Sequence, residues 1–136
     1  MPIDLLRYRR EFASLGFDEP EPGILGIIIA NEGRQNAATE SMHRDLALVW
    51  RVIDVDDAVR VALVRGAGEH FSSGGDFTMI ERMIEDEATL LRVLKEASDL
   101  VYNLINCSKP VVSAIRGTAV GAGLAVALLA DISVAA

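Results

Sequence analysis

Two glycine-rich segments offer backbone N–H groups as a chemical tool. The first reads "HFSSGGDF" and contains Gly74 and Gly75, and the second reads "RGTAVGAGLA" and contains Gly117, Gly121 and Gly123. Because glycine has no β-carbon, each segment can adopt positive φ and let a ligand approach its amides closely. If the two segments face each other, one amide from each can donate to a single oxygen, which stabilises an enolate or a tetrahedral oxyanion. Removing one such donor typically raises the barrier by about 3 kcal/mol.

Glycine clusters also have a plainer interpretation. Glycines after strands make tight turns, and small residues at the start of a helix permit close packing. However, the second segment leads into a predicted helix, whose first N–H groups have no partner inside the helix. Two such segments in one chain, each after a predicted strand, favour the chemical interpretation over two unrelated turns.

Hydrophobic periodicity predicts the strands that position these segments. Residues 23–30, "GILGIIIA", predict a strand buried on both faces. Residues 59–64, "VRVALV", and residues 111–115, "VVSAI", predict two more strands, and "ADISVAA" predicts a fourth. Ligands tend to bind where the carboxyl ends of parallel strands meet, so both glycine segments are expected at that edge of the sheet.

Helical spacing separates these strands. A helix is predicted from Thr39, with Thr39 or Ser41 as its cap, and its apolar side chains are Met42, Leu46, Val49, Trp50 and Ile53. Residues 81–106 predict two helical pieces, the second built on Leu90, Leu91, Leu94, Ala97, Leu100, Val101 and Leu104. Residues 124–129 predict a short buried helix. The strand–helix–strand order predicts parallel neighbours in one sheet.

The composition excludes several classes of partner. Thirteen Lys and Arg against twenty Asp and Glu give a net charge of −7, which argues against binding of nucleic acid or an anionic membrane surface. The uncharged run between Arg116 and Asp131 is too short to span a bilayer. The single cysteine, Cys107, cannot form an internal disulfide, and "MPIDLLRYRREF" lacks the apolar core of a secretory signal. A cytoplasmic location is therefore expected.

Side-chain chemistry is less well supported. His70, Ser73 and Asp76 are near one another in sequence, but no G-x-S-x-G motif accompanies them, so a catalytic triad is disfavoured. Glu81 and Glu85 have i, i+4 spacing and could act as a base, although a solvated acidic face is the more common arrangement.

Metal and nucleotide sites lack their usual motifs. The two histidines are isolated and no paired cysteine exists, so no metal site is expected. His43 is predicted on a helix surface. The spacing of "GTAVGAG" does not match a dinucleotide-binding fingerprint, and no Walker lysine follows it.

Three blocks of the chain together resemble a known family. They read "GILGIIIANEGRQNAATESMHRDL", "VALVRGAGEHFSSGGDFTMI" and "KPVVSAIRGTAVGAGLAVALLADISVAA". Their order and spacing resemble the crotonase, or enoyl-CoA hydratase/isomerase, superfamily. The resemblance implies an α/β fold, a crotonase/ClpP-like spiral of ββα units. It also implies that residues 1–136 form a single domain without the C-terminal part of the usual fold, and that the protein assembles as a homotrimer or hexamer.

The resemblance also implies site residues. It assigns the two oxyanion-hole amides, which bind an acyl-CoA thioester oxygen, to Gly75 and Ala122. The positions expected along the coenzyme A are Arg34, Gln35, Ala37, Ser72 and Ser73. Those expected to continue the acyl pocket are Asp76, Phe77 and Thr78. No cofactor is implied apart from coenzyme A as part of the substrate, and the expected enzyme class is lyase or isomerase, typical of fatty acid metabolism.

The chain departs from the family pattern at one important position. Hydratases of the family place a catalytic glutamate three residues after the second amide donor, where this chain has Ala125. The position of the second catalytic acid would follow Ala136. Addition of water by two glutamates is therefore disfavoured, and a catalytically inactive relative that binds acyl-CoA or serves in assembly is the alternative. A chain that ends at Ala136 is also expected to expose an apolar edge strand and to associate.

Overall fold

A parallel sheet with one antiparallel edge strand organises the structure, a computed structural model that describes residues 1–136. The strands lie in sequence order and are β1 (Gly16–Asp18), β2 (Ile24–Ile29), β3 (Val61–Gly66), β4 (Val111–Ile115) and β5 (Ile132–Ala135). Only β1 is antiparallel to its neighbour. The carboxyl ends of β2, β3 and β4 therefore meet at one edge, as predicted.

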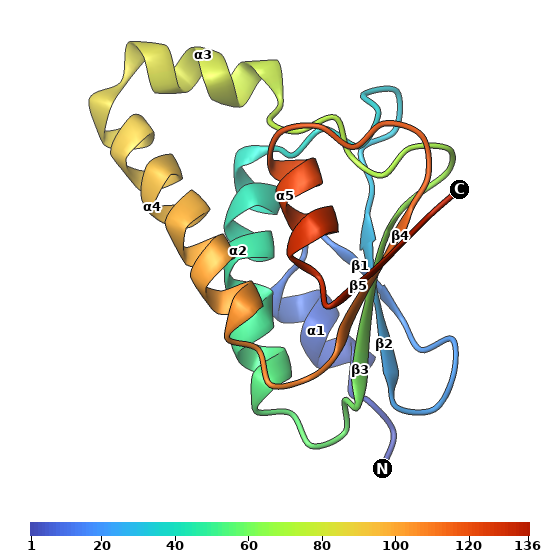
Figure 1. Cartoon of the computed structure of the whole chain (residues 1–136). Helices are drawn as coiled ribbons and strands as arrows, with labels where there is room; N and C mark the ends of the chain where they lie inside the picture. Colours follow the sequence, from blue (N-terminus) through green and yellow to red (C-terminus); the bar gives the residue numbers. More distant parts are fainter.

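The helices cover one side of this sheet (Figure 1). They are α1 (Leu5–Glu11), α2 (Glu40–Asp54), α3 (Phe77–Glu85), α4 (Glu87–Ile105) and α5 (Ala122–Leu129). Helix α2 connects the parallel strands β2 and β3, which confirms the predicted crossover. The hydroxyl of Thr39 accepts a hydrogen bond from the amide of Met42 at 3.3 Å and so caps α2, as predicted. No helix combines the length and the apolar character that crossing a membrane requires.

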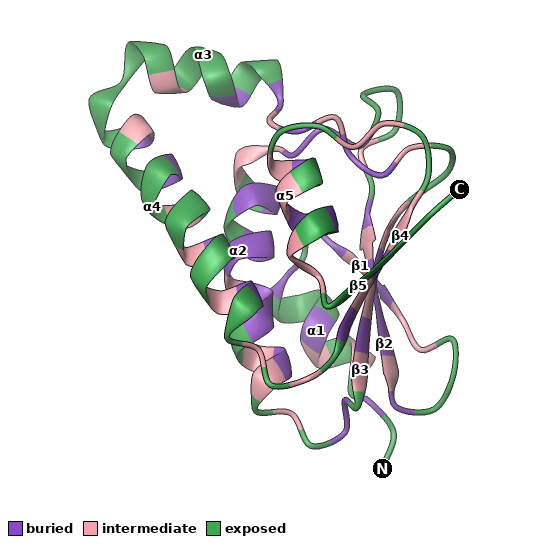
Figure 2. Cartoon of the chain, viewed as in Figure 1, coloured by how far each residue is buried: buried purple, intermediate pink, exposed green.

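The core lies between the sheet and α2 (Figure 2). Trp50 and Ile53 of α2 are completely buried, as are Leu25, Ile27 and Ile29 of β2. Burial of β2 on both faces was the expectation, and it is wrong, because Ile28 points to the other face and is only partly buried. No helix lies on that face of the sheet, so the apolar run of β2 does not signal burial on both sides (Figure 1).

One further sequence prediction needs correction, at His43 of α2, whereas α3 and α4 confirm the two predicted helical pieces. His43 is 4% exposed rather than on a surface, because α4 packs over that side of α2 and places Glu96 3.5 Å from the imidazole Nδ1. The apolar stripe of α4 is only half covered. Leu100 and Leu104 are buried, whereas Leu91 and Leu94 are more than half exposed. The spacing of apolar residues along a helix does not reveal which of them another element covers.

The bounds of β3 and β4 agree closely with the predicted ranges, except for a shift of two residues in β3. The third predicted strand coincides with β4, whereas β3 begins two residues later than predicted. Val59 is completely buried, but its amide donates to the carbonyl oxygen of Asp56 at 3.0 Å in a turn, so it does not pair in the sheet. Strand β5 is exposed along its whole length and forms the free edge of the sheet.

The first eighteen residues form an element pair that the sequence analysis did not predict. Asp4 caps α1 by accepting from the amide of Arg7. The aromatic rings of Tyr8 and Phe12 both pack against the ring of Phe17 in β1, and all three residues are buried. The three- and four-residue spacing of Leu5, Tyr8, Phe12 and Leu15 was the available signal. The charges of α1 obscured it.

Cys107 provides a test of packing at the end of α4. Partial burial raises the pKa of its thiol, so the thiol stays protonated to higher pH than in an unfolded chain. We expect iodoacetamide at pH 8 to alkylate folded Cys107 several-fold more slowly than the urea-unfolded chain. Mass spectrometry of timed samples measures both rates. Equal rates would show that the thiol is freely accessible.

Candidate active site

Three loops meet at the carboxyl edge of the sheet. Residues 30–39 follow β2, residues 67–76 follow β3 and residues 116–121 follow β4. The middle loop lies between the other two, and isolated parallel bridges join Ala38 to Gly75 and Ser72 to Ala119. The two glycine segments, more than forty residues apart in sequence, are thus neighbours in space, as predicted.

Backbone hydrogen bonds hold the three loops in register. The amide of Ala38 donates to the carbonyl oxygen of Gly74 at 2.7 Å, and the amide of Asp76 donates back to Ala38 at 2.9 Å. On the other side of the middle loop, the amide of Val120 donates to the carbonyl oxygen of Ser72 at 3.0 Å. Within residues 71–76 these and similar bonds engage every amide of the middle loop except that of Gly75.

Two glycines allow the loops to approach closely. Gly74 has φ +91°, and a β-carbon added there would lie 2.8 Å from the carbonyl oxygen of Val120. Gly121 has φ +57°, and a β-carbon added there would lie 3.6 Å from the α-carbon of Gly74. A side chain at Gly74 would therefore clash with the loop after β4, whereas at Gly121 the positive φ, rather than a lack of space, favours glycine.

The amides that follow the two contact glycines have no acceptor. The N–H of Gly75 follows the contact glycine Gly74, and the N–H of Ala122 opens α5 immediately after Gly121; neither donates to a protein oxygen. The Ala122 amide belongs to the first turn of α5, where no preceding carbonyl is available. The amide of Gly123 differs, because it already donates to Val120. Both free amides belong to partly buried residues.

A cleft of about 550 Å³ opens beside these amides. Its lining is mostly loop backbone and small side chains, and consists of Gly33, Arg34, Gln35, Ala37, Ser73, Gly74, Gly75, Asp76, Phe77, Ile80 and Gly121. Ala122 adjoins the lining through Gly121. The cleft thus has the free amide of Gly75 in its lining and that of Ala122 next to it. The exposed guanidinium of Arg34, which also lines the cleft, forms no ion pair.

Three of the expected site residues do not line this cleft, namely Ala122, which only adjoins it, Ser72 and Thr78. Ser72 is 2% exposed; its hydroxyl donates to the carbonyl oxygen of Asn36 at 2.8 Å and accepts from the amide of Gly74 at 3.2 Å. Thr78 lies in an adjacent groove with Thr39 and Met79. The structure brings the other expected residues together, and it gives Ser72 a position behind the loop rather than on its surface.

The three residues considered as a triad have separate partners. The Nδ1 atom of His70 accepts from the amide of Thr118 at 3.1 Å, and the hydroxyl of Ser73 donates to the carbonyl oxygen of Arg34 at 3.2 Å. Asp76 caps α3 by accepting from the amide of Thr78 at 2.8 Å. None of the three bonds to another, so the triad alternative is wrong.

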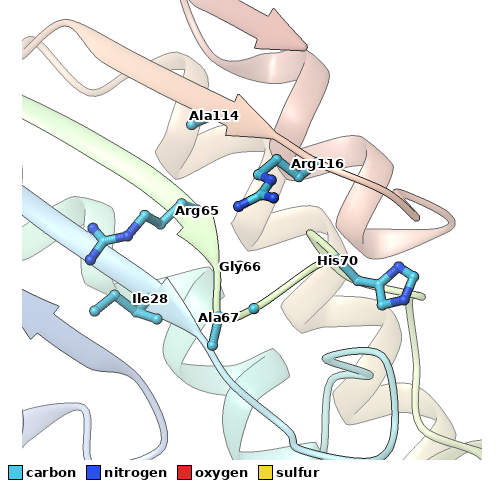
Figure 3. Close-up of a pocket in the computed structure, with 8 residues that line it drawn as sticks. Ile28, Arg65, Gly66, Ala67, His70, Ala114 and Arg116 are labelled. Carbon is cyan, nitrogen blue, oxygen red and sulfur yellow. The ribbon is translucent and has the colours of Figure 1, made fainter. Parts of the chain in front are cut away.

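A second groove at the same edge of the sheet does not bring reactive side chains together. Ile28, Arg65 and Arg116 line it on the face of the sheet without helices (Figure 3). The guanidinium of Arg65 is engaged by Asp18 at 2.6 Å, and the ring of His70 points away from both arginines (Figure 3). The cleft with the free amides is the better candidate.

Comparison with known proteins identifies the family. A family model described as enoyl-CoA hydratase/isomerase matches residues 19–136. The chain belongs to the enoyl-CoA hydratase/isomerase family. This confirms the resemblance seen in the three sequence blocks.

Individual relatives agree with this assignment. A probable enoyl-CoA hydratase of Mycobacterium leprae is 33% identical, with 96% of this chain covering 46% of the relative. A 1,2-epoxyphenylacetyl-CoA isomerase of Escherichia coli is 32% identical, with 85% of this chain covering 45% of it. This chain therefore spans about half the length of these relatives.

Solved structures of the family confirm the fold. An enoyl-CoA hydratase/isomerase from Mycobacterium paratuberculosis superposes with a TM-score of 0.85 at 27% identity, over 90% of this chain and 49% of that chain. A putative enoyl-CoA hydratase from Streptomyces coelicolor gives 0.82 at 31% identity, over 90% and 45%. The α/β crotonase fold is thus confirmed, and the chain contains about half of it.

The cleft of this chain contains few acidic side chains that could transfer a proton. Ala125 lies one turn into α5, partly buried, and supplies no proton-transfer group. Asp76 is the one carboxylate in the lining, and its oxygen already caps α3. Glu81 and Glu85 of α3 are exposed to solvent and do not line the cleft. The arrangement offers hydrogen-bond donors for a developing negative charge, without an unengaged acid in the lining.

Proposed function

We propose that the chain binds an acyl-CoA thioester in this cleft and polarises the thioester carbonyl with the amides of Gly75 and Ala122. When the α-carbon loses a proton or carbon dioxide, the bonding electrons stay behind and negative charge accumulates on the thioester oxygen. Two fixed donors stabilise that charge more than they stabilise the neutral ground state. The proposal thus assigns catalysis to main-chain groups.

One observation supports this proposal most strongly. In residues 71–76 of the middle loop every amide except that of Gly75 donates to a protein acceptor, and the amide of Ala122 is likewise free beside the contact between the two glycine segments. Buried backbone donors are nearly always paired in folded proteins, so two partly buried unpaired ones beside a cleft are consistent with a ligand acceptor. The names of the relatives refer to acyl-CoA compounds, which supports this ligand class for the chain.

The rest of the lining suits a ligand with a charged and an apolar end. Arg34 and Gln35 extend from the loop after β2, and an arginine without an ion pair can contact a phosphate of coenzyme A. Phe77 and Ile80 are exposed apolar side chains of α3 on the lining and can contact an acyl chain. In this assignment Ser73 and Ala37 contact the ligand between the two ends.

The reaction type depends on the proton-transfer group. Hydration by two glutamates remains disfavoured because Ala125 occupies the position of the first. Isomerisation, hydrolysis, decarboxylation or carbon–carbon cleavage of a thioester is compatible with the amide pair, provided that an acid or base comes from another part of the protein.

The alanine also supports a second candidate function. A relative that keeps the cleft but lacks its proton-transfer residue would bind acyl-CoA, or assemble with other chains, without turnover. The two candidates differ in one measurable property, namely turnover of a panel of acyl-CoA thioesters. Assembly as a trimer or hexamer and a cytoplasmic location both stay predictions.

Calorimetry with acetyl-CoA and infrared spectroscopy of its ¹³C-labelled carbonyl test the amide pair. We expect binding, together with a lower carbonyl stretching frequency in the complex than in water. Gly75→Pro deletes one donor and is expected to abolish most of that shift. Gly75→Ala keeps the amide, and its β-carbon meets the flexible end of Met79, so it is the matched control. An unchanged shift in Gly75→Pro, or no binding by the parent chain, would contradict the proposal.

A further inference from the structure

Asn36, in the loop after β2, is a buried polar residue with an unusual backbone conformation. It is 5% exposed and has φ +56°, and its neighbour Gln35 also has a positive φ of +50°. Positive φ is uncommon for residues other than glycine, although asparagine tolerates it best. A buried polar residue held in this conformation requires surrounding contacts that favour it.

The side-chain amide of Asn36 joins its own loop to the middle loop. Its Nδ2 donates to the carbonyl oxygens of Ala67 at 2.9 Å and of His70 at 2.8 Å. Its Oδ1 accepts from the backbone amide of Asn31 at 3.0 Å. Both hydrogens of the amide group and one oxygen lone pair are therefore used, which requires the amide side chain rather than a carboxylate.

The same residue is connected to both free amides through Ser72. The backbone carbonyl of Asn36 accepts from the Ser72 hydroxyl at 2.8 Å, and that hydroxyl in turn accepts from the amide of Gly74, next to Gly75. The carbonyl of Ser72 accepts from the amide of Val120, two residues before Ala122.

His70 provides a second connection. Its carbonyl oxygen accepts from Asn36, and its imidazole Nδ1 accepts from the amide of Thr118 in the loop after β4. Asn36 is thus hydrogen-bonded, directly or through one residue, to all three loops that form the cleft. It does not itself line the cleft.

We propose that Asn36 is a positioning residue that fixes the separation of the Gly75 and Ala122 amides. This inference rests on the proposed function. Without this side chain, the carbonyl groups of Ala67 and His70 lose their donors, while the backbone bonds of residues 72–76 to the other two loops remain. The first part of the middle loop is then less constrained, so the Gly75 amide shifts relative to the Ala122 amide and the two donors converge less well on one oxygen. A displacement too small to unfold the protein is sufficient, because hydrogen bonds weaken steeply with distance and angle.

Asn36→Gly tests this role with little backbone strain. Glycine accepts φ +56°, so the variant removes the three side-chain hydrogen bonds and keeps the loop conformation accessible. Asn103→Ala is the matched control, since Asn103 of α4 also donates a side-chain amide hydrogen bond to a backbone carbonyl, that of Ala47, at 2.7 Å, away from the cleft. Both variants lose buried or partly buried amide hydrogen bonds, and only one of them is connected to the free amides.

The first measurement needs no ligand. In ¹H–¹⁵N spectra of the free 136-residue chain, we expect Asn36→Gly to move the amide signals of Gly75 and Ala122, and Asn103→Ala to leave both in place. Unchanged signals in Asn36→Gly would overturn the inference. Should that variant fail to fold, Asn36→Asp provides the same comparison, because it has the same shape and turns a carboxylate toward two carbonyl oxygens.

The second measurement uses ¹³C-labelled acetyl-CoA at saturating concentration. We expect the carbonyl of the Asn36→Gly complex to shift at least halfway back toward its frequency in water, and that of Asn103→Ala to match the parent chain. A full shift in Asn36→Gly would contradict the positioning role alone. No shift in the parent chain would contradict the proposed function, and the ligand-free spectra would then still decide whether Asn36 holds the two amides in place.

Discussion

Ala122→Pro is expected to lower kcat for acyl-CoA thioesters about 100- to 1000-fold, the usual cost of removing one oxyanion donor. Proline lacks the N–H that we assign to the thioester oxygen. The substitution is otherwise compatible with the backbone, because Ala122 is the first residue of α5 and its amide has no partner to lose. Proline is favoured at this helical position.

The backbone conformation of Gly121, the residue before the substitution, is also compatible with a following proline. Gly121 has φ +57° and ψ −127°, the mirror image of the extended conformation that residues before proline prefer, and glycine adopts both forms equally well. We therefore expect the urea midpoint of Ala122→Pro to stay close to that of the parent chain. A loss of activity without a loss of stability separates a missing donor from a damaged fold.

Ala122→Ser is the control for this experiment. It keeps the N–H and adds only a hydroxyl at a partly buried position. We expect its kcat to remain within a few-fold of the parent value in the same steady-state assay. If Ala122→Pro retains full turnover, the amide is not a donor in the reaction. If the parent chain turns over no thioester, the inactive relative is the better description.

Much of this site could be predicted from the sequence because it depends on strand order. Parallel strands bring their carboxyl ends to one edge, so two glycine segments that follow β3 and β4 are expected at the same edge. That inference needs only the two strands, and both are recognisable from short apolar runs. The contact between Gly74 and Gly121 required coordinates, since it depends on the register that pairs Ala62 with Val111.

The incorrect or missing predictions concern burial by a third element. His43 is polar and sits on an amphipathic helix, so nothing local indicates that α4 covers it. Ser72 belongs to a glycine loop, where exposure is the usual expectation, yet its hydroxyl is bonded behind the loop. Asn36 was not predicted as a site residue, because it too belongs to a loop, where polar residues are usually exposed. Its role depends on carbonyl groups of residues 67 and 70, which no pattern in the sequence identifies.

Gly74→Ala is expected to lower the free energy of unfolding by about 2 to 4 kcal/mol. About 1 kcal/mol comes from placing a side chain at positive φ, and about 1 to 3 kcal/mol comes from the contact of its β-carbon with backbone. The added methyl group would lie 2.8 Å from the carbonyl oxygen of Val120, which is held in place because it accepts from the amides of Gly123 and Leu124. Urea unfolding monitored by the fluorescence of buried Trp50 measures the change.

Gly68→Ala separates the two contributions. Gly68 has a similar positive φ of +68°, in the same connection after β3, but a β-carbon added there meets no atom within 4 Å. It should therefore cost only the conformational part, about 1 kcal/mol. The excess for Gly74→Ala then measures the loop contact itself. Because that contact sets the distance between the two glycine segments, Gly74→Ala should also weaken acetyl-CoA binding, whereas Gly68→Ala should not. Equal losses of stability in the two variants would mean that the loops can separate freely, and a fixed pair of amides would then have no structural basis.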